Sequence, residues 1–286
     1  MPARQPFTVL CQTAARSRTT GRADLHLHTT YSDGAYTPAE IVDLARRSGL
    51  AAVAITDHDS FEGVPDARTA ARGVEVIAGV EISSEYHGRE LHLLGYFILL
   101  DDAPLTSALA TLRAERAGRF WEMVKRLRGC GVSVNEEELR DHAGTSSLGR
   151  RNLAEFLVKT GRANSVRDVF ARYLGDRGRV VVPKVRLPVA DAIRLVRGAA
   201  GVAAWAHPSY DCTRDSLAEL RDLGLGAVEV DYPSNRAARS RELRTWAAEL
   251  GLAVTGGSDC HGPGHYARAV GACSVTAEEL ERLRRV

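Results

Sequence analysis

Long apolar runs are absent from this sequence of 286 residues. No stretch approaches 18 consecutive apolar residues, so we expect no membrane span. Cysteine is also scarce, and the five that occur are scattered and form no CxxC pair: Cys11, Cys130, Cys212, Cys260 and Cys273. An odd, dispersed count is typical of reduced thiols, so we expect a cytoplasmic protein without disulfides.

Several catalytic and cofactor motifs are missing as well. There is no Walker or GxGxxG phosphate loop, which argues against ATP or NAD use. There is no GxSxG elbow, and no cysteine is placed to attack a substrate. Residues 1–22 contain no acidic residue and no signal-peptide core, so we interpret them as a disordered extension or a misplaced start, with a transit-like peptide as the minor alternative.

Charge of one sign is not in excess, because the net charge is only +2. Global charge therefore does not indicate a nucleic-acid partner. The distribution is uneven, since residues 101–186 hold 17 Lys/Arg and 11 Asp/Glu. A locally basic region of this kind can bind anions.

Short apolar runs of strand length recur along the chain and predict buried parallel strands. They cover residues 23–28, 50–56, 74–82, 91–99, 201–207, 226–232 and 252–257. Helical patterns lie between most of them. The clearest is "TPAEIVDLARRSG", in which Thr37 and Glu40 form a capping box around Pro38. Alternating strands and helices predict an α/β fold, a (β/α) barrel somewhat short of eight units.

Residues 101–187 interrupt this alternation with amphipathic helical patterns only. We therefore expect a small helical insertion at 101–187, with the barrel domain formed by residues 23–100 and 188–286.

Polar residues adjoin the ends of the predicted strands. Among them are six of the nine histidines of the chain. The set is His26, His28, Asp57, His58, Asp59, Glu81, His92, His207, Asp259 and His261. A barrel brings the carboxyl ends of its strands to one face, so these residues could converge. Imidazoles and carboxylates together are ligands of Zn, Mn or Fe.

Each of these residues alone has a plainer interpretation. His58 could be a turn residue, Glu81 a cap or ion-pair residue, and His207 a strand end. Asp57 and Asp59 could equally orient ligands or cap the following helix. The other histidines and one cysteine keep the plainer interpretation: His87, His142, His265 and Cys260. It is the joint placement that favours a metal site.

The motifs "DLHLHTTYSDG", "ITDHDS", "GVEIS", "HLLGY", "AHP" and "GSDCHGPG", in this order, resemble the polymerase and histidinol phosphatase (PHP) family over residues 23–275. The insertion, with "LGRRNLAEFLV" and "VVVPK", resembles a subgroup of nucleotide 3′,5′-bisphosphate phosphatases and a 5′-3′ exoribonuclease acting on short RNA. This resemblance implies a distorted, TIM-like (β/α)7 barrel with a trinuclear metal centre.

The resemblance also implies the ligands of three divalent ions, Mn²⁺ with Fe²⁺ or Zn²⁺ as alternatives. The first ion would be held by His26, His28, Glu81 and Asp259. The second would share Glu81 and add His92 and His207. The third would be held by Asp33, His58 and His261.

The resemblance further implies hydrolysis by a hydroxide bridging the metals, with Asp259, His261, His207 and Arg150 taking part directly. Arg150 and Lys184 are candidates to bind substrate phosphate. The sequence departs from the subgroup at Asn152 and at Ser209, positions that we expect to touch substrate.

We therefore expect a metal-dependent phosphoesterase acting on a phosphorylated nucleotide or short RNA. A phosphatase of a small metabolite such as histidinol phosphate is the alternative within enzymes. A non-catalytic module binding metal or phosphate is the alternative outside them. We expect no membrane, duplex DNA or obligate protein partner.

Overall fold

The computed structural model describes residues 21–143, 148–175, 178–263 and 268–286. These residues form two compact units. The first contains the described residues before Ala110 together with Leu187–Val286, and the second is Ala110–Arg186. The predicted extension, residues 1–22, falls almost entirely on residues 1–20, which lie outside the described residues.

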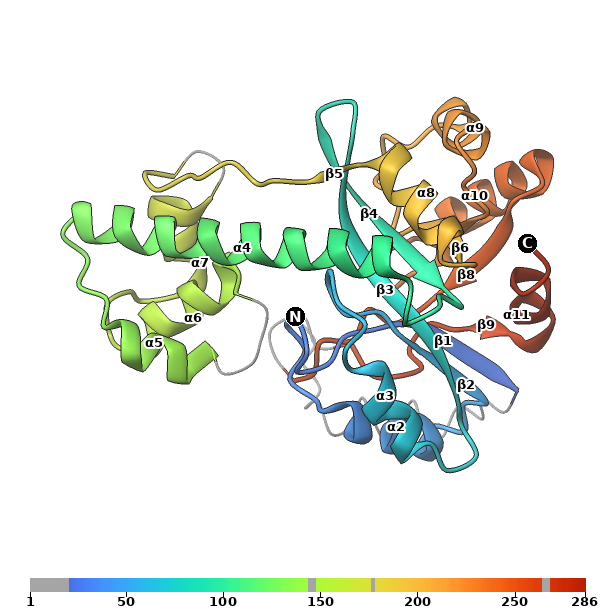
Figure 1. Cartoon of the computed structure of the whole chain (residues 1–286), viewed down its shortest axis with the longest axis horizontal. Helices are drawn as coiled ribbons and strands as arrows, with labels where there is room; N and C mark the ends of the chain where they lie inside the picture. Colours follow the sequence, from blue (N-terminus) through green and yellow to red (C-terminus); the bar gives the residue numbers. More distant parts are fainter. Residues whose placement is uncertain (1–20, 144–147, 176–177, 264–267) are drawn as a thin grey trace. The chain divides into compact units, whose positions relative to one another are not determined.

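The first unit is built on one sheet, with helices packed against it (Figure 1). Its strands are β1 (Arg22–Leu27), β2 (Ala52–Ile55), β3 (Glu75–Tyr86), β4 (Arg89–Tyr96), β5 (Leu187–Pro188), β6 (Val202–Trp205), β7 (Ala227–Asp231), β8 (Ala253–Gly256) and β9 (Val275–Thr276). Its helices are α2 (Pro38–Arg47), α3 (Val64–Ala70), α8 (Val189–Gly198), α9 (Arg214–Asp222), α10 (Ala237–Leu250) and α11 (Ala277–Leu283).

The sheet is a nearly closed barrel. Its strand order is β8-β7-β6-β4-β3-β2-β1-β9, and β5 adds to β3. A parallel bridge between Leu27 and Cys260 brings the segment after β8 against the end of β1. The predicted α/β barrel is confirmed, and the two-residue strands β5 and β9 are additions that the apolar pattern did not reveal.

One strand runs against the predicted direction. The expectation of parallel strands is wrong for β4, which pairs antiparallel with both β3 and β6. The reason is local: only His87 and Gly88 separate β3 from β4, and both have positive φ (49° and 75°). Two such residues make the tight turn of a β-hairpin, which forces the strands to be antiparallel. As a result, His92 near the start of β4 lies opposite Ser83 in β3.

Helices cover the outside of the barrel. In Figure 1, α2 and α3 lie beside β2 and β3, α8 beside β4 and β6, and α10 beside β7 and β8. The predicted start of α2 is confirmed, since the Thr37 hydroxyl accepts from the Glu40 N–H and the Glu40 carboxylate accepts from the Thr37 N–H. Buried aliphatic side chains such as Leu25, Ile77 and Leu94 pack together in the core of this unit.

The second unit is helical. Its elements are the helix α4 (Ala103–Gly129), which begins in the first unit, then α5 (Glu136–Ala143), α6 (Arg150–Lys159), α7 (Val166–Val169) and the π-helical turn η1 (Phe170–Leu174). It has a core of its own, with Phe120, Leu139 and Phe156 buried among their neighbours. Such a separate core is what allows a segment to fold as a compact unit.

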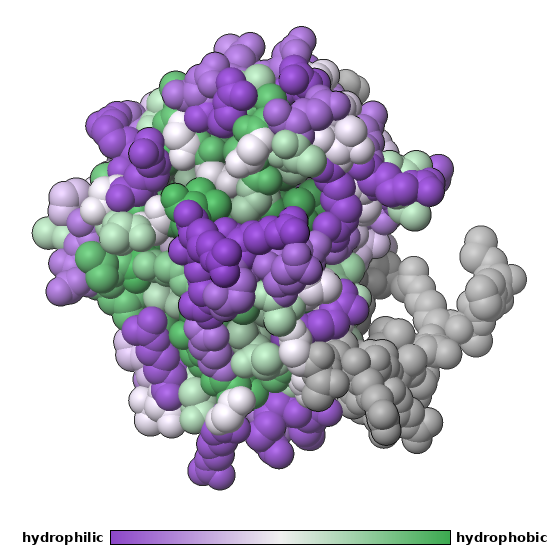
Figure 2. All heavy atoms as spheres, turned by 90° about the vertical axis from the view of Figure 1, so that its right-hand side faces the viewer, coloured by the Kyte–Doolittle hydropathy of each residue, from purple (hydrophilic) through white to green (hydrophobic). Residues whose placement is uncertain are grey.

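The surface view of Figure 2 shows hydrophilic side chains spread over the visible face, with smaller hydrophobic groups between them. Among the described helices, none is long and apolar enough to cross a membrane.

Candidate metal centre

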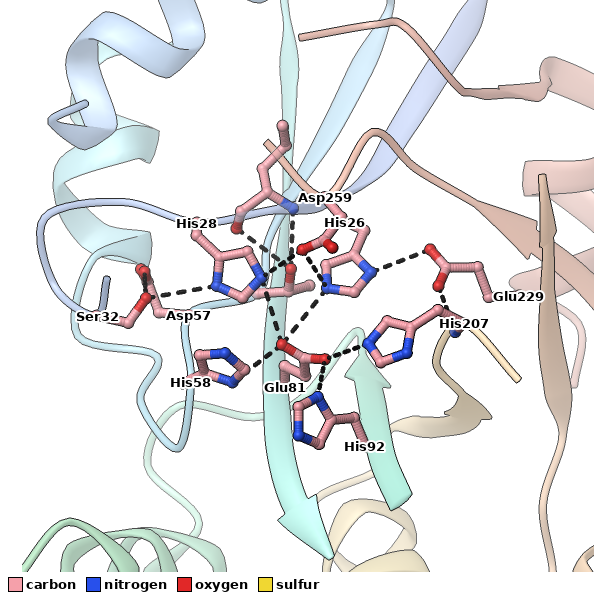
Figure 3. Close-up of polar contacts among 12 residues, drawn as sticks. His26, His28, Ser32, Asp57, His58, Glu81, His92, His207, Glu229 and Asp259 are labelled. Carbon is pink, nitrogen blue, oxygen red and sulfur yellow. Dashed lines mark hydrogen bonds and ion pairs between the residues drawn. The ribbon is translucent and has the colours of Figure 1, made fainter. Parts of the chain in front are cut away.

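The nine predicted ligand side chains come together inside the barrel unit, as Figure 3 shows for most of them. His26 lies in β1, and His28 and Asp33 follow that strand. Glu81 and His92 come from the β3–β4 hairpin, and the others follow strands: His58 after β2, His207 after β6, and Asp259 and His261 after β8.

The candidate ligand atoms form four overlapping groups. Within each group, all of the atoms lie within 4.8 Å of one another. The groups are His28, Asp33, His58 and His261; His26, His28 and Asp259; His26, Glu81 and His207; and His58, Glu81 and His92. Because the groups share residues, the atoms form one continuous cluster.

The carboxylate of Glu81 is at the middle of this cluster and is almost fully buried. Five imidazoles face its two oxygens. The distances from Oε1 are 2.8 Å to His92 Nδ1 and 3.1 Å to His207 Nε2; those from Oε2 are 3.0 Å to His58 Nδ1, 3.3 Å to His28 Nε2 and 3.5 Å to His26 Nε2. A buried carboxylate facing imidazole nitrogens is a candidate ligand of divalent cations.

The ring nitrogens that face away from the centre have other partners. His26 Nδ1 lies 3.0 Å from Glu229 Oε1, and His92 Nε2 lies 2.9 Å from Glu90 Oε1. His261 Nδ1 lies 3.0 Å from the carbonyl oxygen of Asp259. Outer partners of this kind fix the ring tautomer and leave the opposite nitrogen with a free lone pair, as in known metal sites.

Four buried inner atoms make no well-directed hydrogen bond among the described residues, although each of them faces other ligand atoms of the cluster. They are His26 Nε2, His28 Nε2, His58 Nδ1 and Asp33 Oδ1. A buried polar atom without a partner costs about 1–3 kcal/mol, so such a concentration calls for an explanation. Divalent cations supply it, because imidazole nitrogens and carboxylate oxygens are their ligands. The residues therefore fit a metal centre.

The electrostatics of the site also favour cations. Burial alone would raise the pKa of the Glu81 carboxyl, but the surrounding imidazoles, His58 foremost, hold that pKa well below its usual range. Burial lowers the pKa of His58. For His28 the effect of burial is outweighed by Asp259 and Glu81, which raise its pKa to about 10. The carboxylates thus attract positive charge to the centre, carried by protons when no metal is bound.

Asp57 and Asp59 hold the backbone around the site. Asp57 accepts from the backbone N–H and hydroxyl of Thr29 and from the hydroxyl of Ser32, whose oxygen is 3.5 Å from His28 Nδ1. Asp59 accepts from the backbone N–H and hydroxyl of Ser83. Neither caps α3, whose N-cap, the glycine at 63, makes no side-chain cap bond.

Asp259 is held from outside the centre. Its Oδ2 accepts from the Tyr232 hydroxyl at 2.9 Å and from Arg268 Nη1 at 2.7 Å, and the Arg268 guanidinium stacks on the Tyr232 ring at 4.6 Å. Its Oδ1 lies 3.2 Å from His28 Nε2. One oxygen is thereby engaged outside, and the other faces the cluster.

Three of the four predicted substrate contacts have local hydrogen bonds in their own units. Arg150 Nη1 donates to the carbonyl oxygen of Leu174 at 3.2 Å, and Asn152 Oδ1 accepts from the N–H at position 149 as part of the cap of α6. The Ser209 hydroxyl donates to Asp211. Lys184 lies in an irregular segment before β5. Their contacts with substrate stay predictions.

Two of the histidines given the plainer interpretation lie away from the cluster. His87 is exposed and pairs with Glu219, and His142 contacts Phe156 in the second unit. Cys260 is buried. His265 lies outside the described residues.

Sequence reasoning missed Glu229, Glu90, Tyr232 and Arg268. Only Glu229 had a visible signal, because it is an acidic residue in the middle of an apolar strand run, "GAVEVDY". A charged residue inside a buried strand is rare unless it is paired.

Comparison with known proteins agrees with this geometry. The PHP domain family model matches residues 24–159. A 5′-3′ exoribonuclease from Haemophilus influenzae is 31% identical over 251 residues, which cover 85% of this chain and 91% of that protein. A 3′,5′-nucleoside bisphosphate phosphatase from Chromobacterium violaceum is 32% identical over 256 residues, covering 87% and 90%.

The fold has a similar counterpart among solved structures. A protein from Bifidobacterium adolescentis, assigned to the metal-dependent phosphoesterases, matches with a TM-score of 0.83 at 29% identity, covering 91% of this chain and 94% of that one. Since relatives above 30% identity align along nearly their whole length, the chain belongs to the PHP domain family.

Proposed function

We propose that this chain is a metal-dependent phosphoesterase that hydrolyses phosphate esters of nucleotides. Its substrate would be a nucleoside 3′,5′-bisphosphate or the 5′ end of a short RNA. The observation that carries the proposal is the cluster around Glu81, in which the imidazole nitrogens and carboxylate oxygens of nine buried or half-buried residues converge. The named activities of the two relatives, phosphatase and exoribonuclease, support the substrate class.

We assign the ligands to three ions, with Mn²⁺ as the first choice and Fe²⁺ or Zn²⁺ as alternatives. One set is His26, His28, Glu81 and Asp259; the second is Glu81, His92 and His207; the third is Asp33, His58 and His261. When bound, such ions lower the pKa of water and neutralise charge on the phosphoryl oxygens.

The side chains of the cluster differ in their access to solvent, which indicates how a substrate approaches. His26 and His28 are fully buried, whereas the side chains of Asp33, His207 and His261 are 28%, 26% and 38% exposed. The scissile phosphate would therefore enter on the side of these three residues, and the buried imidazoles would act only as ligands.

A cysteine nucleophile is disfavoured by the thiols of the barrel unit. Burial raises the pKa of Cys212 to about 11 and that of Cys273 to about 12, so both stay protonated near neutral pH. None of the described cysteines forms a disulfide. A cytoplasmic location remains part of the proposal.

Arg150 and Lys184 would bind phosphate groups of the substrate. Arg150 is placed at the start of α6, and a guanidinium there can form two hydrogen bonds to a phosphate. Asn152 and Ser209 would set which nucleotide is accepted.

A panel of phosphoesters tests the proposal. Purified protein is loaded with Mn²⁺, Fe²⁺ or Zn²⁺ and assayed with 3′,5′-bisphosphoadenosine, histidinol phosphate and oligoribonucleotides of increasing length. Phosphate release from bisphosphoadenosine, or nucleotide release from RNA, supports it. Turnover of histidinol phosphate alone would indicate that the substrate is a small metabolite and not a nucleotide. No turnover by metal-loaded protein would favour the non-catalytic module.

A further inference from the structure

Glu229 uses both of its carboxylate oxygens on two different candidate ligands. It lies in β7, a strand that supplies none of the nine ligand side chains, and it is completely buried. Its Oε1 is 3.0 Å from His26 Nδ1, and its Oε2 accepts from the backbone N–H of His207 at 2.6 Å. Figure 3 shows the side chain reaching both residues.

The first contact determines the tautomer of His26. A buried carboxylate only accepts, so His26 Nδ1 must carry the proton that it donates to Glu229. In the neutral ring, Nε2 then has the lone pair. This is the atom that lies 3.5 Å from both Glu81 and Asp259 and has no hydrogen-bond partner among the described residues.

The second contact holds the backbone of His207. This residue has φ of 30°, outside the ordinary conformations of a non-glycine residue. Such a conformation persists only when surrounding bonds enforce it. The short bond from its N–H to Glu229 is one of these, and the rings of His26 and His207 end up nearly parallel, 5.7 Å apart with 17° between their planes.

We propose that Glu229 is a positioning residue that prepares His26 and His207 together for metal binding. It keeps the lone pair of His26 Nε2 directed at the centre and fixes the backbone from which the His207 ring extends. One carboxylate on β7 thereby positions one candidate ligand in β1 and another that follows β6. This role rests on the proposed metal centre and deepens it, because it concerns how the centre is assembled.

The variant Glu229→Gln separates this role from simple packing, since glutamine has the same shape. Its single carbonyl oxygen can accept from only one of the two donors. If it accepts from the His207 N–H, its amide faces His26 and favours a proton on Nε2, where a metal can no longer bind. If the glutamine amide group is flipped, its NH₂ faces the His207 N–H, and two donors cannot form a hydrogen bond. Either arrangement disturbs one ligand.

The test measures metal binding rather than turnover. Titration calorimetry and metal analysis with Mn²⁺ and Zn²⁺ compare wild type, Glu229→Gln and the control Tyr96→Phe. The control removes a buried hydroxyl that shares a hydrogen bond with Thr255, within the same barrel unit. We expect Glu229→Gln to bind metal about 10- to 100-fold more weakly, the usual effect of losing an outer partner of a ligand. We expect the control to bind metal normally.

Unchanged affinity and stoichiometry in a folded Glu229→Gln protein would overturn the role. If the variant fails to fold, nitrogen NMR of zinc-loaded wild type decides, because a His26 Nδ1 without a proton would also overturn it. Wild-type protein that binds metal but hydrolyses no phosphoester would contradict the proposed function and leave the role of Glu229 standing.

Discussion

At the residue scale, several candidate ligands direct one polar atom at the centre and bond another to a residue that is not a ligand. His26, His92 and His261 each have one ring nitrogen engaged outside the cluster. Likewise, Asp259 Oδ2 accepts from Arg268, whereas Asp259 Oδ1 faces His28. This arrangement matters because it leaves inner lone pairs in fixed directions before any ion arrives, which reduces the reorganisation needed for binding.

His58→Ala should lower turnover by more than about 100-fold, beyond the usual effect of changing an outer partner, because it removes a ligand itself. The side chain is 12% exposed and follows a strand, so the fold should stay intact. The measurement is kcat with circular dichroism as the check on folding.

His87→Asn provides the matched control for that variant. His87 is exposed in the β3–β4 turn, and asparagine tolerates its positive φ. Near-normal kcat and metal content in His58→Ala would show that His58 is not a ligand.

Metal binding should release protons at pH 7. Asp259 and Glu81 overcome the effect of burial and raise the pKa of His28 to about 10, so this ring is protonated in the metal-free protein and must lose its proton to become a ligand. Affinity should therefore rise with pH up to about that value. Calorimetry in two buffers of different ionisation enthalpy measures the protons released, and a value near zero would contradict the assignment.

Most of the candidate ligands could be proposed from the sequence because they lie at or near an end of a predicted strand, whereas Asp33 came only from the family resemblance. The residues that hold them could not. Tyr232 and Arg268 are ordinary loop residues in sequence, and only the fold brings them to Asp259. Glu90 also gave no signal, because it is one of several charges around the β3–β4 turn.

At the scale of single elements, the hairpin of β3 and β4 brings His92 to the centre although this residue lies near the start of its strand. In a parallel barrel, a residue near a strand start lies at the wrong end. Because the turn at His87 and Gly88 reverses β4, its start lies beside the later part of β3, near Glu81. The apolar run predicted the strand, but it could not predict the direction, which depends on two turn residues.

The approach of the segment after β8 to β1 depends on Gly257. A Cβ at this position would lie 2.4 Å from both the backbone nitrogen and the Cβ of His26. Gly257→Ala should therefore displace His26 or separate the two segments, destabilising the protein by about 1–3 kcal/mol and weakening metal binding.

Thermal unfolding and metal titration measure these two effects. Gly251→Ala is not a suitable control, because that residue has a positive φ of 69°. Gly118→Ala is suitable, since a Cβ there meets nothing within 4 Å. Wild-type stability and metal affinity in Gly257→Ala would contradict the packing argument.

In the helical unit, Arg150→Ala should chiefly raise KM, because a residue that binds the phosphate of the ground state contributes equally to substrate and transition state. The neighbouring Arg151→Ala is the matched control, since Arg151 forms an exposed pair with Glu155. Unchanged KM and kcat in Arg150→Ala would assign Arg150 a structural role, such as its bond with Leu174.

At the scale of the whole molecule, bound metal should stabilise the native state. Ions that bind only the folded protein add RT ln(1 + [L]/Kd), about 2.7 kcal/mol at 100 times Kd. For a chain of this size that corresponds to an increase in Tm of roughly 4–5 °C. Scanning calorimetry with and without chelator measures it, and a Tm independent of metal concentration would argue against the centre.

The central claim is that the cluster around Glu81 binds the ions that drive phosphoester hydrolysis. It is tested most directly by following phosphate release from 3′,5′-bisphosphoadenosine while metal-free protein is titrated with Mn²⁺ and the bound metal is counted. We predict no turnover without metal and a maximum when about three ions are bound per chain, the number of ligand sets in the centre. Equal turnover without metal, or none at full occupancy on this or any other phosphoester, would contradict the account.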